Sequence, residues 1–259
     1  MRVSKLVLAF AVLCAAGCAH RPPDEPMDPL EPVNRGVYKF NRVADRYVLR
    51  PVAKRYKKYT PREFQSGVHN FLDNLFYPTT IVNAFLQGKV AQGSRDVGRF
   101  VINTTLGIAG IMDVATPLGL ERNKEDLGQT LGKYGFGEGI YLMLPFFGPS
   151  NGRDLIGRVG DSFTGPTPIA DLANAYTVTS YNASDAVSYS LSAVGAIDQR
   201  AGLLGADRML NEQSDPYLFL RTAYLQRRQG LVYDGNPPKQ KFDFDDSEGD
   251  SDSASDSGE

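Results

Sequence analysis

The stretch RGVYKFNRVADRYVLR, residues 35–50, decides the fold. Its apolar side chains recur at the three- and four-residue spacing of one helix face: Val37, Phe40, Ala44, Tyr47 and Val48. Its arginines lie largely on another side: Arg35, Arg42, Arg46 and Arg50. The pattern predicts a basic amphipathic helix. We expect Asn34 to cap this helix at a start at Arg35, and Pro51 to kink or end it.

Helical spacing also dominates the rest of the chain. Residues 71–107 predict two or three short helices, with Pro78 at a helix start and Gly88 as a stop. Residues 167–210 predict a pair of helices. A further helix is predicted over 215–230, capped at Ser214 or Asp215 with Pro216 in its first position. Strand-like alternation is scarce, so we expect a mainly α fold in a single domain, residues 34–234.

Two segments combine glycine with an unusual apolar load. Residues 100–120 carry one charge, Asp113, and are too short to cross a bilayer, so a buried core helix and a hairpin immersed in lipid both fit. Residues 130–154 surround the apolar patch YLMLPFFGP with glycines, which favours a loop or hairpin. Within them, GFGEG lacks the preceding strand of a dinucleotide motif and the Lys-Ser/Thr of a phosphate loop. Turn glycines explain it better.

The N-terminus predicts an exported and lipidated chain. Residues 1–17 have a basic start, an apolar stretch and small residues before Cys18, as in a lipoprotein signal peptide. An ordinary signal peptide with an incidental cysteine is the alternative. Acyl chains on Cys18 would anchor the protein stably, and the proline-rich residues 18–33 would form a tether. Ala19 is not the aspartate of inner-membrane retention, which favours the inner face of an outer membrane.

Composition excludes most catalytic chemistry. After cleavage, Cys18 is the sole cysteine and carries lipid, and His69 is the sole histidine beyond the tether. No G-x-S-x-G elbow is present, so we expect no enzyme, no cofactor and no metal. A set of carboxylates shows no metal-ligand spacing and is expected to pair at the surface with Arg122, Lys124, Arg153 and Arg158: Glu121, Glu125, Asp126, Asp154 and Asp161.

Charge is distributed unevenly along the chain. Residues 243–259 carry eight acidic and no basic side chains, so we expect the tail, residues 235–259, to be disordered. Residues 18–242 hold 26 basic and 22 acidic side chains, a net charge of +4, which suits an anionic lipid surface. No footprint of a nucleic-acid-binding protein is present.

Two polar faces are candidate functional surfaces. Arg42, Arg46 and Arg50 alternate with aromatic rings, which suits a membrane interface and lipid headgroups. A solvated charged face on an ordinary globule is the alternative. The second face fits the lining of a wet passage and equally an ordinary solvent-facing side: Thr177, Thr179, Ser180, Asn182, Ser188, Ser190 and Ser192.

Four separated stretches together resemble the MlaA/VacJ lipoprotein family. They are DPLEPVNRGVYKFN (28–41), NTTLGIAGIMDVA (103–115), GQTLGKYGFGEGIYLMLPFFGPSNGRD (128–154) and DPYLFLRTAYLQRRQGL (215–231). The resemblance implies an all-α, ring-like protein in the inner leaflet of a Gram-negative outer membrane, beside a porin trimer of the OmpC/OmpF type. Its amphipathic channel would take phospholipids from the outer leaflet and pass them to an MlaC-like periplasmic carrier, which maintains lipid asymmetry.

The resemblance also suggests roles for particular residues. Phe40 and Asn41 match a segment thought to control channel opening. Other residues match a hairpin near the pore: Gly132, Gly135, Gly137, Gly139, Tyr141, Pro145, Gly148 and Pro149. Three alternatives are a porin or envelope adaptor without transport, a phospholipase-like enzyme, which would depend on His69, and a soluble lipid carrier, which would not need Cys18.

Overall fold

The computed structural model describes residues 28–164 and 181–238, with side chains described throughout except at 181–188. The predicted signal peptide, Cys18, most of the tether and the acidic tail from residue 239 lie outside the described residues. Those described are mainly helical, as predicted, and include a two-stranded hairpin. None of the helices within these ranges combines the length and the apolar character needed to cross a membrane.

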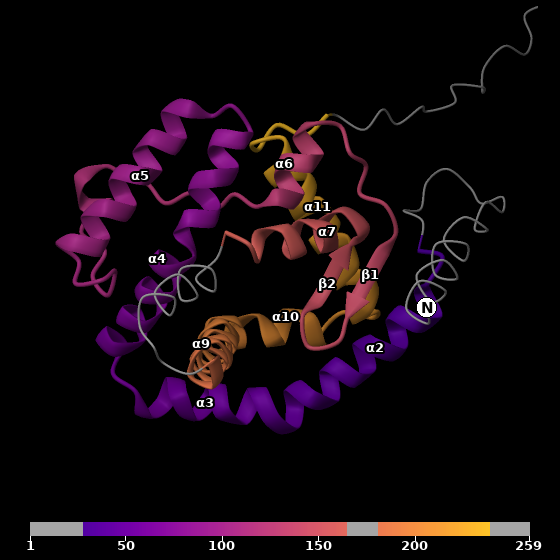
Figure 1. Ribbon diagram of the computed structural model, residues 1–259. Coiled ribbons are helices and arrows are strands. Elements are labelled where there is room, and N and C mark those ends of the chain that lie inside the picture. The colour runs from indigo at the N-terminus through magenta and orange to yellow at the C-terminus, as the bar shows by residue number, and fades with distance from the viewer. Residues whose placement is uncertain (1–27, 165–180, 239–259) are drawn as a thin grey trace, which may run out of the picture.

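The helices and strands follow one another along the chain as shown in Figure 1. In order they are α2 (Glu31–Ala44), the π-helix η1 (Asp45–Leu49), α3 (Arg50–Tyr59), α4 (Arg62–Leu86), α5 (Val90–Thr105), the 3-10 turn η2 (Thr116–Leu118), α6 (Leu127–Lys133), β1 (Tyr141–Leu144), β2 (Gly148–Asn151), α7 (Gly152–Asp161), α9 (Tyr181–Gly202), the 3-10 turn η3 (Leu203–Ala206), α10 (Asp207–Asn211) and α11 (Pro216–Val232).

The basic amphipathic stretch forms one curved element in which α2, η1 and α3 join without a break (Figure 1). One boundary prediction was wrong. The first helix begins at Glu31, and Asn34 lies buried inside it instead of capping it. Of the two outcomes predicted for Pro51, a kink or an end, the helical run does not end there, and its regular α-geometry is interrupted just before the proline by η1. A proline crowds the carbonyl four residues before it, and the wider turn of η1, directly upstream, accommodates that crowding.

Helix α4 runs through Pro78, so the prediction of a helix start there was also wrong. Side chains on both sides of the proline hold the helix in place: Tyr77 Oη donates to Asp96 Oδ1 of α5 at 2.8 Å, and Asn83 Nδ2 donates to Asp161 Oδ1 at 2.9 Å. Gly88 ends the segment as predicted, with a φ of 75°. Tertiary contacts therefore override the local preference of the proline.

Of the two expectations for residues 100–120, the buried core helix is wrong, and immersion of a hairpin in lipid stays a prediction. They complete α5 and then turn back through a loop that ends in η2. Asn103 stabilises this loop, because its Oδ1 accepts hydrogen bonds from the backbone amides of Val114 and Ala115, each at 2.9 Å. A buried core helix is excluded, since Leu106 and Ile108 are 66% and 64% exposed.

Two asparagines on α2 fix the hairpin against that helix. Asn34 Nδ2 donates to the carbonyl of Tyr141 at 3.0 Å, and its Oδ1 accepts from the amide of Met143 at 2.8 Å. Asn41 repeats the pattern at the turn: its Nδ2 donates to the carbonyl of Leu144 at 2.9 Å, and its Oδ1 accepts from the amide of Phe146 at 2.8 Å.

The spacing of these two clamps follows from backbone geometry. Seven residues of helix rise about 10.5 Å, and three residues of extended strand span about 10 Å. The two asparagines are therefore spaced so that Asn34 reaches the start of β1 and Asn41 reaches its end. The hairpin itself is antiparallel, with Tyr141 opposite Asn151 and Leu144 opposite Gly148.

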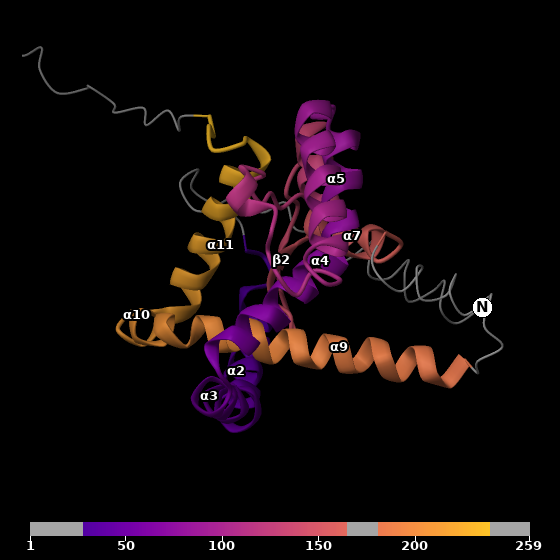
Figure 2. The ribbon, with the colours of Figure 1, turned by 90° about the vertical axis from the view of Figure 1, so that its left-hand side faces the viewer.

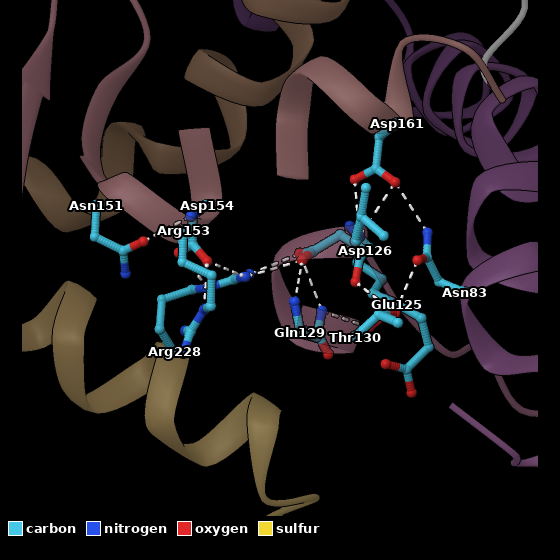
Figure 3. A network of polar contacts seen from close by, with 12 residues as sticks. Asn83, Glu125, Asp126, Gln129, Thr130, Asn151, Arg153, Asp154, Asp161 and Arg228 are labelled. Atoms are coloured by element: carbon cyan, nitrogen blue, oxygen red, sulfur yellow. Dashed lines mark hydrogen bonds and ion pairs between the residues drawn. The ribbon is translucent and has the colours of Figure 1, made fainter. Parts of the chain in front are cut away.

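The interior is largely polar, and its centre is a network around Arg228 of α11 (Figure 3). The guanidinium donates to Asp126 Oδ2 at 2.6 Å and to Asp154 Oδ1 at 2.8 Å, so it joins α6, α7 and α11. The Arg228 partner outweighs burial and holds the pKa of Asp126 below its usual range. Only 11% of the Arg228 side chain is exposed.

The predicted surface pairing of the carboxylates was therefore wrong for most of them. Asp126 and Asp154 pair with Arg228 in the interior, and Glu125 Oε1 lies 2.9 Å from Nζ of Lys89. Asp161 accepts hydrogen bonds from the amide of Leu127, while burial raises its pKa. Only the contact of Asp154 with Arg153, at 3.4 Å, matches the expected partners, and it too is buried.

The C-terminal helices complete the domain. Figure 2 shows α9 extending sideways from the body, with α10 and α11 on the opposite side. Asp215 caps α11 and Pro216 occupies its first turn, as predicted, because the Asp215 carboxylate accepts from the amides of Tyr217 and Leu218. Arg35 of α2 reaches the same carboxylate, with Nη2 2.6 Å from Oδ2, so the two ends of the domain are joined.

The network in Figure 3 predicts a large loss of stability on removing its cation. Arg228→Met leaves half-buried Asp126 without a cation partner and buried Asp154 with Arg153 alone, so we expect the free energy of unfolding to fall by about 3 kcal/mol. Denaturant titrations in one detergent measure the change. Arg227→Met is the matched control, since Arg227 is exposed and its substitution should cost at most about 0.5 kcal/mol. Equal stability of the two variants would contradict the role of the network.

Candidate functional site

A cavity of about 680 Å³ lies between α2 and η1, the hairpin turn and the segment from α9 to α11. Apolar side chains form much of its wall: Leu49, Met143, Phe146, Phe147, Leu203, Met209, Leu210, Phe219 and Leu220. Four arginines also line it: Arg42, Arg46, Arg50 and Arg200. The volume falls in the range of cavities that take small organic ligands.

A compact ion-pair cluster lies at one part of this wall. Arg200 of α9 contacts the Asp45 carboxylate through two nitrogens, with Nε 2.6 Å from Oδ1 and Nη2 2.9 Å from Oδ2. The same Nη2 donates to Asp207 Oδ1 at 2.8 Å, and Arg50 Nε lies 3.1 Å from Asp207 Oδ2. The cluster therefore fixes α9 and α10 against the π-helix, and both of its carboxylates are paired.

The other two arginines keep more of their charge available. Among the described residues, Arg42 donates only to neutral oxygens, Tyr38 Oη at 3.3 Å and Asn211 Oδ1 at 3.0 Å. Within residues 28–164 and 189–238, Arg46 forms no hydrogen bond or ion pair and its side chain is exposed. The cavity thus combines an apolar wall with excess positive charge, an arrangement that fits an amphipathic anion.

The structure brings together two groups of predicted site residues. Asn41 lines the cavity and clamps the hairpin turn, and the neighbouring Phe40 packs on Phe146 with ring centroids 5.2 Å apart. Gly148 and Pro149 of the hairpin line the same cavity, as do Arg42, Arg46 and Arg50. Segments far apart in the sequence therefore meet at one place. The roles suggested for them stay predictions.

The other residues predicted to form a hairpin near the pore do not line the cavity. Tyr141 is buried in the small aromatic cluster with Tyr38 and Tyr217. Gly132 lies in α6, where a Cβ atom would meet Val232 at 2.8 Å. Pro145 follows β1 in the turn. Gly135, Gly137 and Gly139 lie in the loop between α6 and β1.

The predicted polar lining of 177–192 is only partly within the described residues. Thr177, Thr179 and Ser180 lie outside them, and for Asn182 and Ser188 only the backbone of α9 is described. Ser190 borders a second, mostly apolar cavity of about 630 Å³ between α4, Ile111 and α9. Ser192 is exposed on α9. Neither Ser190 nor Ser192 is among the residues that line the first cavity.

Sequence reasoning missed the wall contributed by 196–211. Arg200, Leu203, Asp207 and Leu210 line the cavity there. The three- and four-residue spacing of Arg200, Leu203, Asp207 and Leu210 could have indicated a shared helix face. The channel lining was predicted at 177–192 instead, because hydroxylated residues are frequent there.

His69 takes part in a surface ion-pair cluster. Its Nδ1 lies 2.8 Å from Asp198 of α9, its Nε2 lies 3.3 Å from Asp73, and 49% of the side chain is exposed. Arg122 also contacts Asp73. In the described part of the chain, no three histidine, cysteine or acidic side chains are grouped to hold a metal ion. The cluster links α4 to α9. Among the described residues, the His69 imidazole contacts two carboxylates and Arg122, and no serine, threonine or cysteine side chain.

Comparisons with known proteins found similar sequences and a similar structure. A family model described as MlaA lipoprotein matches residues 26–231. The chain is 37% identical over 247 residues to the Escherichia coli K12 protein named intermembrane phospholipid transport system lipoprotein MlaA, covering 93% of this chain and 92% of that one. The Haemophilus influenzae protein of the same name is 32% identical, with 91% and 93% covered.

A solved structure is also similar. It is described as the structural basis for maintenance of bacterial outer membrane lipid asymmetry. It is 36% identical and superimposes with a TM-score of 0.68, covering 80% of this chain and all of that one. The family match spans nearly the whole described domain, and the relatives match over almost their full length. The chain belongs to the MlaA lipoprotein family.

Proposed function

We propose that this chain is the outer-membrane lipoprotein of an intermembrane phospholipid transport system and maintains the lipid asymmetry of that membrane. Family membership and the names of the relatives support this function. The structural observation that supports this function is the 680 Å³ cavity, because its apolar wall can contact acyl chains and its arginines can bind a phosphate. The family is not enzymatic, so no hydrolysis is assigned to His69.

We further propose that the domain is ring-like and lies in the inner leaflet, with the cavity as part of an amphipathic channel. Large apolar side chains on the outside support immersion in lipid, since exposed apolar patches mark membrane or protein contacts. Phe136 and Leu106 are 60% and 66% exposed, and Ile108 is 64% exposed. A headgroup crossing this region needs a polar path, because desolvating its charge is costly.

In this proposal the transport runs from the outer leaflet towards the periplasm. A porin trimer of the OmpC/OmpF type would contact the apolar perimeter, and an MlaC-like carrier would accept the lipid. Asn41 would act on the passage through the hairpin turn that it clamps at both Leu144 and Phe146. The rival function, a porin or envelope adaptor without transport, needs neither an open cavity nor a movable hairpin.

A variant that fills the cavity distinguishes the transport function from the adaptor function. Ala196 lines it on α9, whereas Ala193 lies one turn away, exposed and outside the wall. We expect Ala196→Trp to raise outer-leaflet phospholipid to the level of cells lacking the chain, because the indole occupies the ligand's space. Ala193→Trp should restore the wild-type level. Labelling of outer-leaflet phospholipid on intact cells measures both. Restoration by both variants, with equal protein levels, would favour the adaptor.

The anchor gives a second test. Cys18→Ser removes the acylated thiol, and because stable attachment needs more than one acyl chain, we expect a chain that no longer fractionates with the outer membrane and fails to restore asymmetry. Membrane fractionation and the same phospholipid labelling measure these effects. A periplasmic, soluble Cys18→Ser chain that restores asymmetry fully would show that a lipid carrier, not an anchored lipoprotein, is at work.

A further inference from the structure

We propose that Arg42 and Arg46 form a phosphate-binding subsite that gives the cavity a preference for phospholipids with net negative headgroups, such as phosphatidylglycerol, over zwitterionic ones. This inference rests on the proposed function and names the substrate class for the same cavity. It depends on the distribution of charge around the wall, and in particular on which arginines already have a carboxylate partner.

Both carboxylates that line the cavity already have ion-pair partners. Asp45 pairs with Arg200 through two contacts, and Asp207 is shared between Arg200 and Arg50. Arg200 is 14% exposed in its side chain, so this cluster is a fixed part of the wall. Two carboxylates are thus matched by Arg200 and Arg50, and the local charge of the cluster is balanced.

The excess charge lies on α2 and η1. Arg42 is held by the neutral oxygens of Tyr38 and Asn211, so its position is fixed while its charge stays uncompensated. Arg46 follows four residues later, and no carboxylate of the described residues pairs with it. Four residues correspond to about one helical turn. Two guanidinium groups therefore line the cavity with a net charge of +2.

This charge balance discriminates between headgroups. Every phospholipid has a phosphate that the guanidinium groups can bind. A zwitterionic headgroup also brings an ammonium group, which the second arginine repels, and both acidic residues that line the cavity, Asp45 and Asp207, are already paired. A glycerol headgroup brings only hydroxyls. Leu203, Leu210 and Phe219 give the acyl chains an apolar wall, so the site is built for a lipid and not for free phosphate.

A lipid-competition experiment on the full acylated chain tests the subsite. The chain is exposed to mixed micelles with equal phosphatidylglycerol and phosphatidylethanolamine, re-isolated, and its bound lipids are quantified by mass spectrometry. We expect wild type to retain more phosphatidylglycerol. Arg46→Gln should reduce that ratio by up to about fivefold, the effect of one partly exposed charge pair. The double variant Arg42→Gln/Arg46→Gln should abolish the preference.

Two controls make the test specific. Arg46→Lys retains the positive charge and should keep most of the preference, whereas a purely structural role of the side chain would not be rescued by charge. Arg55→Gln removes an exposed arginine of α3 that does not line the cavity, and it should leave the ratio unchanged. Inorganic phosphate at millimolar concentration should not displace the lipid, because it lacks acyl chains.

The outcomes that overturn the inference are distinct from a failure of the proposed function. An unchanged lipid ratio in the double variant, with lipid still bound, would overturn the subsite while leaving the lipid-binding function standing. Displacement of lipid by inorganic phosphate would replace the lipid subsite with a site for free phosphate. A wild-type chain that retains no phospholipid would overturn the proposed function and the subsite with it.

Discussion

The contact between Arg228 and its two aspartates is the interaction on which the rest of the fold depends. It joins α6, α7 and α11 in the interior, while large apolar side chains such as Leu106 and Phe136 are exposed. In the proposed lipid setting the domain gains little from burying apolar surface, because the acyl chains are as apolar as its own side chains. Hydrogen bonds and ion pairs between elements then have to hold the helices together, as they do here.

The same principle explains how the hairpin is held. Asn34 and Asn41 supply amide groups that pair with the backbone of β1 and of the turn, much as a neighbouring strand would. The short hairpin thereby gains a partner on its open edge, and the cavity gains a wall whose position depends on two side chains of α2. Passage through the proposed channel and stability of the domain are therefore linked through one helix.

The sequence indicates local features well and long-range ones poorly. The cap at Asp215 and the stop at Gly88 are local, and both predictions were confirmed. Asn34 is a favourable cap residue, yet its partners at Tyr141 and Met143 lie more than 100 residues away and move it into the interior. Arg228 stands beside another arginine in a stretch that looks like a solvated face, and its carboxylate partners lie 102 and 74 residues away.

The candidate site was predictable to a similar extent. The helical pattern identified Arg42, Arg46 and Arg50, and the resemblance to a family pointed to Asn41 and the hairpin. The ion-pair cluster of Arg200 with Asp45 could not be predicted, because it depends on how α9 packs against η1. β1 is a run of four apolar residues and β2 contains a glycine and a proline, so neither strand shows an apolar-polar alternation and only a loop or hairpin could be expected there.

The most direct test of the cavity as the place of phospholipid binding is photo-crosslinking with a phospholipid that carries a diazirine near the end of one acyl chain. Peptide mass spectrometry then locates the adducts on the acylated chain. We expect adducts on Leu203, Leu210 and Phe219, which form the apolar wall. Adducts confined to the outer apolar surface, at residues such as Leu106 and Phe136, would contradict binding in the cavity.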